Sequence, residues 1–326
     1  MTSKRDRIEA AIQGESTDRT PVALWRHFPV DDQDPEILAD STVRFQERFN
    51  FDLVKVTPAS SFCLKDWGVK DEWRGDPEGT RAYTNRIIES PKDWERLPVL
   101  DPGSEHLARQ LSCLRLLRER LGSDVPMIQT IFNPLAQAKN LAGKARLFEH
   151  LHQAPRLVEN GLKTILESTL AFVEALRSIQ IDGIFFAVQH GSYHFFDAPG
   201  YERFGETFDL PILEAARSWW LNILHLHGEA VMFDLASRYP VQVVNWHDLA
   251  TAPSLSEGAQ LFAGAVCGGT RRDTIVLGTP DEIRAETLAA IKATESRGLI
   301  LSTGCVVPII APEGNIRIVR ETAECA

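Results

Sequence analysis

Short apolar runs alternate with amphipathic stretches along the whole chain. The apolar runs are typical of buried strands, which we predict at 21–25, 51–56, 127–132, 182–188, 223–227, 241–246 and 298–303, with weaker runs at 263–266 and 274–277 around a Gly-Gly turn. In the amphipathic stretches one face is apolar, and this pattern predicts helices at 3–13, 35–49, 104–121, 135–142, 155–179, 199–221, 280–296 and 312–324.

Strands that alternate with helices predict an α/β fold in which parallel strands are joined by crossover helices. About eight such units in 326 residues favour a single (β/α)8 TIM barrel over an open doubly wound sheet. No Gly-x-Gly-x-x-Gly motif follows an early strand, which counts against a dinucleotide-binding sheet. We therefore predict one barrel domain over 1–326, with an irregular insertion after the second strand at 57–102 and a small hairpin near 82–88.

Composition narrows the class of protein. Hydrophobic residues make up 44% of the chain and charged residues 25%, and the net charge is −10. This acidic balance argues against binding to nucleic acid or to an anionic membrane surface. No apolar run reaches the ~18 residues of a membrane span, and the N-terminus lacks the apolar segment of a signal peptide. The five cysteines are scattered without a Cys-x-x-Cys pair, so we predict a reduced, cytoplasmic chain.

Two strand ends carry metal-binding residue types. His225 and His227 end one apolar run, and side chains at i and i+2 of a strand point to the same face. Cys305 follows the last apolar run. Because two imidazoles and a thiolate are typical zinc ligands, we predict that these residues meet and bind zinc. The alternative is that both histidines form hydrogen bonds within the barrel or with a substrate, and that Cys305 is an ordinary buried thiol.

Further polar residues follow other predicted strands, where barrel enzymes place their sites. Arg26 predicts a clamp for a carboxylate or phosphate; the alternative is a salt bridge to the acidic loop at 31–32. Asn133, Gln189 and His190 are neutral polar groups that can orient a substrate. We predict all four as substrate-binding residues.

Histidines gather at the strand ends, whereas His106 falls on the predicted helix 104–121, and His150 and His152 fall on the helical stretch that begins at 135–142; all three are expected to face solvent. We predict His247 as a catalytic residue that lines the pocket. Its neighbour Asp248 would point to the opposite face of the strand, so a direct acid–base pair is not expected.

Several motifs resemble the uroporphyrinogen decarboxylase superfamily over nearly the whole chain. The resemblance implies a (β/α)8 barrel. The motifs that carry it are Asp18-Arg19-Thr20-Pro21-Val22, Phe51-Asp52, Thr130-Ile131-Phe132-Asn133-Pro134-Leu135, Asp182-Gly183-Ile184-Phe185, Ile223-Leu224-His225-Leu226-His227-Gly228, Leu301-Ser302-Thr303-Gly304-Cys305 and Pro312-Glu313-Gly314-Asn315-Ile316.

The superfamily has a branch of cofactor-free decarboxylases and a branch of zinc-dependent, cobalamin-linked methyltransferases. The decarboxylases hold tetrapyrrole carboxylates with arginines near the first strand and use an aspartate after the second. This chain keeps Arg26 but has Thr57-Pro58-Ala59-Ser60 at the aspartate position. The methyltransferases show His-x-Cys-Gly and a later Gly-Cys, which His225-x-His227-Gly228 and Gly304-Cys305 resemble, with histidine in place of one cysteine.

The resemblance therefore implies a zinc-dependent methyltransferase or demethylase for a small-molecule substrate. The methyl-corrinoid would be carried by a separate partner protein, since the chain has no Asp-x-His-x-x-Gly cobalamin motif. Two alternatives remain: a cofactor-free, uroporphyrinogen-type decarboxylase of a carboxylated substrate, with Arg26 as its clamp, and a non-catalytic barrel that binds a tetrapyrrole.

Overall fold

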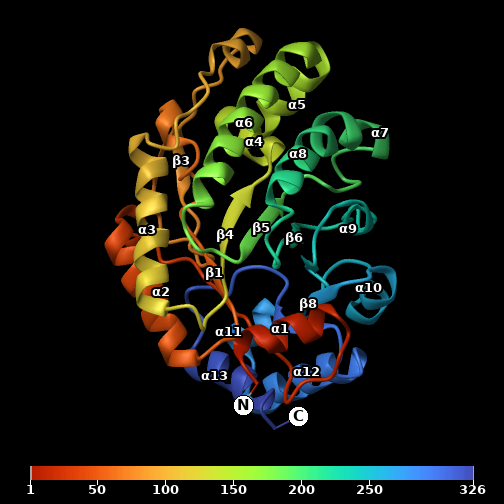
Figure 1. The fold of residues 1–326 in the computed structure, drawn as a ribbon. Coiled ribbons are helices and arrows are strands. Elements are labelled where there is room, and N and C mark those ends of the chain that lie inside the picture. Colours follow the sequence, from red (N-terminus) through yellow and green to blue (C-terminus); the bar gives the residue numbers. More distant parts are fainter. Residues whose placement is uncertain (1, 326) are drawn as a thin grey trace.

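A curled parallel sheet lies at the centre of the molecule, and helices surround it (Figure 1). This computed structural model describes residues 2–325, so Met1 and Ala326 of the predicted domain lie outside the described residues. The strand order is β1-β4-β5-β6-β7-β8-β9, and all six pairings are parallel. The strands are β1 (Val54–Val56), β4 (Met127–Phe132), β5 (Gly183–Val188), β6 (Ile223–Leu226), β7 (Val243–Trp246), β8 (Ala265–Thr270) and β9 (Leu299–Thr303).

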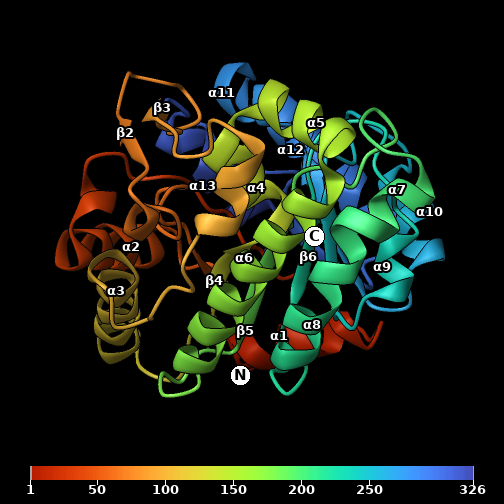
Figure 2. The same cartoon turned by 90° about the horizontal axis from the view of Figure 1, so that it is seen from above.

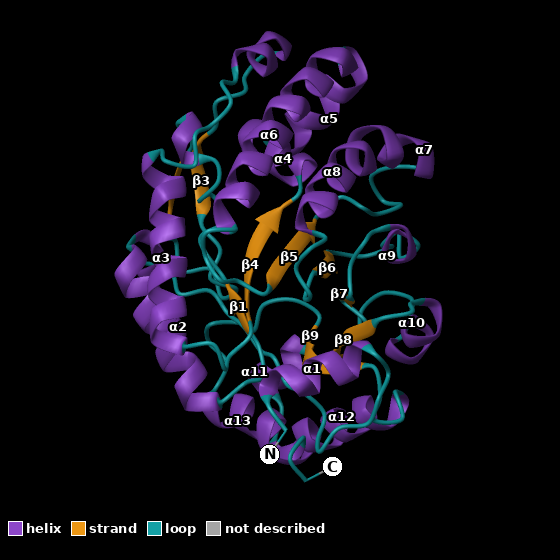
Figure 3. Ribbon diagram, viewed as in Figure 1, coloured by secondary structure: helices purple, strands orange, loops and turns teal. Residues whose placement is uncertain are grey.

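The helices pack outside the sheet, as the view from above in Figure 2 and the colouring in Figure 3 make clear. Both termini lie at the same end of the molecule, near α1, α12 and α13 (Figure 1). The α-helices are α1 (Lys4–Ile12), α2 (Pro35–Phe49), α3 (Glu105–Leu121), α4 (Pro134–Ala142), α5 (Lys144–Gln153), α6 (Pro155–Leu176), α7 (Ala198–Tyr201), α8 (Thr207–Ala216), α9 (Leu235–Arg238), α10 (Leu255–Leu261), α11 (Arg272–Leu277), α12 (Pro280–Ala293) and α13 (Glu313–Thr322). None of the helices within residues 2–325 has the length and apolarity needed to cross a membrane.

Local sequence explains where the helices begin and end. The Asp34 carboxylate caps α2 by accepting from the N–H groups of its first turn, and Pro35 follows as the first helical residue. Asn50 ends this helix in the left-handed conformation that asparagine tolerates. Thr279 and Glu282 form a reciprocal capping box at the start of α12.

The predicted strand at 21–25 is reduced to a single bridge, so the sheet has seven regular strands among the described residues. Val22 bridges to Leu301 of β9, and on its other side its carbonyl accepts from the Asp52 N–H at 2.8 Å. The Val22 N–H donates instead to the Asp52 carboxylate at 2.9 Å. A side chain thus takes the place of a backbone partner, while the segment still lies between β9 and the residues that lead into β1.

The segment between β1 and α3 contributes no strand to the central sheet. Within it, β2 (Lys70–Glu72) and β3 (Ala82–Asn85) pair with each other as an antiparallel two-stranded sheet, flanked by the short 3-10 helices η2 (Lys65–Trp67) and η3 (Pro91–Arg96). The hairpin predicted near 82–88 was therefore misplaced, because residues 82–85 form only its second strand.

Two other local predictions were wrong. The apolar run 274–277 belongs to helix α11, and Gly268-Gly269 lies inside strand β8 rather than in a turn. A Cβ on Gly269 would lie 2.5 Å from the Cβ of Ala290 in α12. A Cβ on Gly268 would lie 2.5 Å from the carboxylate of Asp248. Both glycines therefore allow close approach, one of a side chain and the other of a helix, a use of glycine that resembles a turn in sequence.

Candidate metal centre

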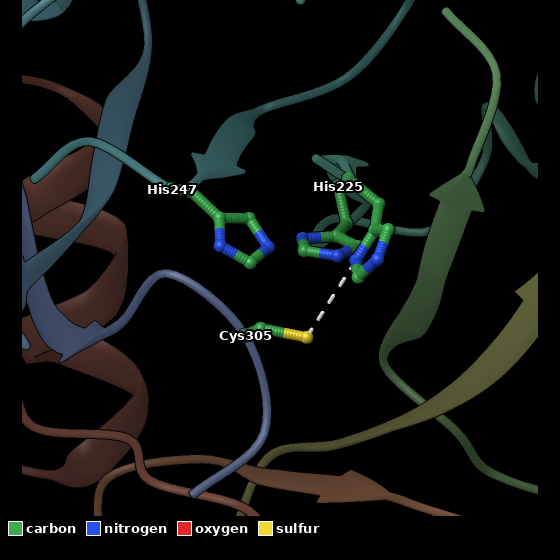
Figure 4. Close-up of side chains that lie close together, drawn as sticks. His225, His247 and Cys305 are labelled. Carbon is green, nitrogen blue, oxygen red and sulfur yellow. Dashed lines mark hydrogen bonds between the residues drawn. The ribbon is translucent and has the colours of Figure 1, made fainter. Parts of the chain in front are cut away.

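Three histidines and one cysteine converge at the carboxyl ends of β6, β7 and β9. His225 lies in β6, His227 follows it, His247 follows β7, and Cys305 stands two residues after β9. One ligand atom from each of the four residues can be chosen so that all four lie within 4.8 Å of one another. In Figure 4 the rings of His225 and His247 and the thiol of Cys305 point into the same space.

The spacing is close to that of a tetrahedral site. Zinc bonds of 2.0–2.3 Å require ligand atoms ~3.4–3.7 Å apart. The Cys305 sulfur lies 3.8 Å from Nδ1 of His227, the contact drawn as a dashed line in Figure 4. The His227 and His247 ring centroids are 5.0 Å apart, and those of His225 and His227 are 5.6 Å apart. A small inward movement of the side chains would therefore complete a coordination sphere.

His225 is held in one tautomer by Asn245 on the neighbouring strand. The Asn245 amide nitrogen donates to the carbonyls of Cys267 at 2.7 Å and Thr303 at 3.1 Å, which leaves its oxygen as the acceptor. That oxygen lies 2.6 Å from His225 Nδ1, so Nδ1 carries the proton. The lone pair is then on Nε2, as a metal ligand requires.

Burial and the neighbouring imidazoles act in opposite directions on the pKa of the Cys305 thiol. Burial acts to raise the pKa of Cys305, but the three neighbouring imidazoles of His225, His227 and His247 hold that pKa well below its ordinary value. Burial likewise lowers the pKa of His225, whereas for His227 the Cys305 hydrogen bond and charge overcome burial and raise the pKa. The cluster therefore stabilises a thiolate, which is the form of cysteine that binds metal.

His247, predicted from the sequence as a catalytic residue that lines the pocket, is the fourth member of the cluster. Its Nε2 is buried without a hydrogen-bond partner among the described residues. An imidazole nitrogen that lacks a hydrogen-bond partner and lies beside a thiolate can serve as a fourth metal ligand or accept a proton. The neighbouring Asp248 turns away and accepts from the Gly269 N–H at 3.0 Å, so the two do not form an acid–base pair.

The donor set fits a zinc ion. His225 lies in β6 and Cys305 follows β9, far apart in sequence, and Asn245 fixes the orientation of the His225 ring before any metal binds. Such an orienting hydrogen bond is what metal-binding histidines commonly show.

The remaining predicted residues are not all near this cluster. His190 packs against the rings of Phe148 and Phe195, with its Nδ1 unpartnered, and burial followed by the charges of Lys139, Lys144 and His227 lowers its pKa to about 3. Gln189 is half-buried beside it. Both follow β5, the neighbour of β6.

Asn133 and Arg26 are engaged elsewhere. Asn133 is fully buried, caps α4 through its oxygen, and donates to the buried Asp209 at 3.1 Å. The Arg26 guanidinium stacks over Phe28 and Phe45, at 5.2 and 5.5 Å from the ring centroids. It forms no salt bridge to 31–32, so the alternative prediction of an ion pair there was wrong.

A cavity of about 490 Å³ opens beside the cluster. It is lined by His247 and Gly304, by Thr270 at the end of β8 and by residues of α11. Thr270 lines it with a hydroxyl that is buried and has no hydrogen-bond partner. The cavity provides room for a substrate next to the candidate metal ligands.

Sequence reasoning missed Asn245 and Lys55. Both are polar residues inside strands that otherwise read as apolar, and this contrast is the signal that could have found them. Such a residue inside a buried strand needs a partner or a function.

Comparison with known proteins gives a family match, related methyltransferases and a similar solved structure. The profile of the family described as Uroporphyrinogen decarboxylase (URO-D) matches residues 3–325. Methylcobamide:CoM methyltransferase MtbA of Methanosarcina acetivorans is 21% identical, over 99% of this chain and 97% of its own length. Methylcobamide:CoM methyltransferase MtaA of Methanosarcina barkeri is also 21% identical, over 96% and 95%. A solved structure described as a methyltransferase from Methanosarcina mazei has a TM-score of 0.85 at 18% identity and covers 99% of both chains. The similarity therefore extends along the whole chain.

Proposed function

The chain belongs to the uroporphyrinogen decarboxylase family, and we propose that it is a zinc-dependent methyltransferase or demethylase that works with a separate corrinoid protein. The observation that carries the proposal is the group of four donor atoms within 4.8 Å of one another at the ends of β6, β7 and β9. The relatives whose names specify methylcobamide and CoM support the same reaction class. We propose that the chain acts as one barrel domain.

In this proposal His225, His227 and Cys305 hold the metal, and His247 faces the fourth position. When bound, zinc would act as a Lewis acid on the group that gives or receives the methyl. The unpartnered Nε2 of His247 can accept the proton that an incoming thiol or hydroxyl releases. Gln189 and His190 would contact the substrate from the next strand.

The ligand set would carry an unusual charge for this branch. Two imidazoles and one thiolate leave a divalent centre with a net positive charge, whereas the His-x-Cys and Cys pattern leaves it neutral. Imidazole in place of thiolate makes the centre a stronger Lewis acid and a weaker electron donor. We therefore expect an acceptor or donor group that brings its own negative charge.

The corrinoid enters as a substrate on a partner protein and not as a group held by this chain. The cavity of about 490 Å³ beside His247 supports a small-molecule site at the same edge of the sheet. In this proposal Cys305 must stay reduced to bind zinc, which is compatible with the reduced, cytoplasmic chain predicted from the sequence. The full engagement of Asn133 with Asp209 gives it a structural role in this proposal.

Metal analysis and a transfer assay test the proposal. The protein is purified without added metal, and zinc is measured in the wild type, in Cys305→Ala and in the matched control Cys267→Ala, which changes a buried thiol in β8. We expect about one zinc per chain in the wild type and control, and little in Cys305→Ala. Demethylation of methylcobalamin with a thiol acceptor should follow the same order. Absence of zinc from the wild type, or full zinc in Cys305→Ala, would contradict the proposal.

The cofactor-free decarboxylase is the alternative. Its predicted clamp, Arg26, keeps an unpartnered Nε that a carboxylate could reach only after the guanidinium leaves Phe28 and Phe45. Release of carbon dioxide from a carboxylated substrate by metal-free protein would favour that alternative.

A further inference from the structure

Lys55 is a buried lysine in the middle of β1. Its side chain is 7% exposed, and its ammonium donates one long hydrogen bond, at 3.3 Å, to the hydroxyl of Thr57. No carboxylate among residues 2–325 forms an ion pair with it. An ammonium has three donors, and a buried charge without a partner is unfavourable. The site thus has unused donors, and because burial lowers the pKa of Lys55 to about 7, an anionic ligand would stabilise its charged form.

The surroundings of Lys55 place it inside the barrel, on the same side as the candidate metal centre. Its Nζ lies 4.6 Å from the ring centroid of Phe185 and 5.8 Å from that of Trp25. The same Phe185 ring stacks on His225, with centroids 5.1 Å apart. One aromatic side chain therefore contacts both the lysine and a proposed zinc ligand.

His27 adds a second unused polar group near the lysine. It is 8% exposed, and its Nδ1 has no partner among the described residues. Burial, and then the charge of Lys55, lowers the pKa of His27 to about 4, while the Cys305 thiolate acts on both groups in the opposite direction. Lys55, His27 and Cys305 are therefore near enough for the charge of each to act on the others.

We propose that Lys55, with His27 beside it, binds an anionic group of the substrate, a carboxylate or a sulfonate, while the reacting end of that substrate reaches the metal centre. This inference rests on the proposed function. Aromatic rings flank the ammonium without neutralising it, so the pairing charge comes from the ligand. Lys55 is thereby the residue that selects anionic over neutral substrates.

Two thiols of equal length test the selection. Protein loaded with Co²⁺ is titrated with 3-mercaptopropionate and with 3-mercapto-1-propanol, and each dissociation constant is read from the sulfur-to-cobalt charge-transfer absorption. We expect the wild type to bind the carboxylate thiol at least about tenfold more tightly, as a charge-assisted hydrogen bond provides. Lys55→Met should abolish this preference and leave the neutral thiol within about threefold.

The controls separate charge recognition from folding. Lys65→Met changes another lysine of low exposure, which already has Asp71 as its carboxylate partner at 3.3 Å, and should keep the preference. Equal binding of both thiols by the wild type would overturn the proposal even if Lys55→Met does not fold, and so would an equal loss for both thiols in Lys55→Met. A wild type that binds no Co²⁺ would instead contradict the proposed metal centre.

Discussion

The side-chain oxygen of Asn245 lies 2.6 Å from Nδ1 of His225, across the β6–β7 pair. Since two backbone carbonyls fix the Asn245 amide, this one contact sets both the tautomer and the orientation of the ring. Asn245→Ala should therefore lower zinc affinity by about 10- to 100-fold, the range for lost outer hydrogen bonds to metal ligands. Competition with a chelator measures the change.

A second buried asparagine offers a matched control. The side chain of Asn222, just before β6, bonds backbone groups, namely the Ile184 N–H at 3.1 Å and the carbonyls of Ala216 at 3.0 Å and Trp219 at 3.3 Å. Asn222→Ala should lower the free energy of unfolding without changing zinc affinity. If both variants lose zinc equally, the Asn245 effect is a general loss of stability and the orienting role is wrong.

His247 makes a prediction about coordination number. If its imidazole occupies the fourth position in the absence of substrate, X-ray absorption of the zinc protein should report three nitrogens and one sulfur. In His247→Ala one nitrogen should be replaced by an oxygen of water, while zinc remains bound through His225, His227 and Cys305. An unchanged spectrum would leave His247 as a proton acceptor only.

The alternation of apolar runs with amphipathic stretches in the sequence predicted most of the fold. Strand and helix positions follow from the apolar pattern because parallel strands are buried on both faces and crossover helices on one. The local predictions that were wrong depend on contacts with individual partner residues. The Val22 N–H pairs with the Asp52 side chain, and Gly269 allows the close approach of α12, and neither use leaves a periodic signal.

The site was partly predictable for a related reason. The i, i+2 spacing of His225 and His227 is local, and Cys305 follows another strand that ends at the same edge. The convergence of His247 and the support from Asn245 depend on the register between β6 and β7, which pairs His225 with Asn245. Register is a property of two segments together, so one segment's pattern does not contain it.

Asp209 predicts a pH dependence of stability. It is fully buried, and although Tyr201, Tyr239 and Asn133 donate to it, burial raises its pKa to about 7. The folded state then keeps a proton that the unfolded state releases near its ordinary pKa of about 4. Between these values the folded state binds more protons, so stability falls as pH rises from about 4 to about 7.

Asp209→Asn removes that titration and should flatten the profile. Urea unfolding at several pH values across this range measures the slope for the wild type and the variant. A wild-type stability that rises through the range, with a rise that disappears in the variant, would show that the three donors hold the carboxyl ionised and that its pKa is lowered instead.

Gly161 in α6 predicts a packing effect that is independent of the site. The ring of Trp94 lies against it, and a Cβ at Gly161 would approach Trp94 Cε3 to 2.6 Å. The indole has no room to move, because it is fully buried and its Nε1–H donates to His150 Nδ1 at 3.0 Å. That bond also shows that the expectation of a solvent-facing His150 was wrong. Gly161→Ala should therefore lower the free energy of unfolding by about 1–3 kcal/mol, as overpacking of a core does.

Gly314 in α13 is the control, since a Cβ there would meet no atom within 4 Å and the position is exposed. Alanine is favoured over glycine inside a helix by roughly 0.5–1 kcal/mol. Gly314→Ala should therefore be neutral or slightly stabilising in urea unfolding, while Gly161→Ala is destabilising. The two changes are chemically identical and both lie in helices, so the difference between them isolates the contact with Trp94. Equal stability of the two variants would mean that α6 can move away from the indole, and that the contact does not fix the position of α6 against η3.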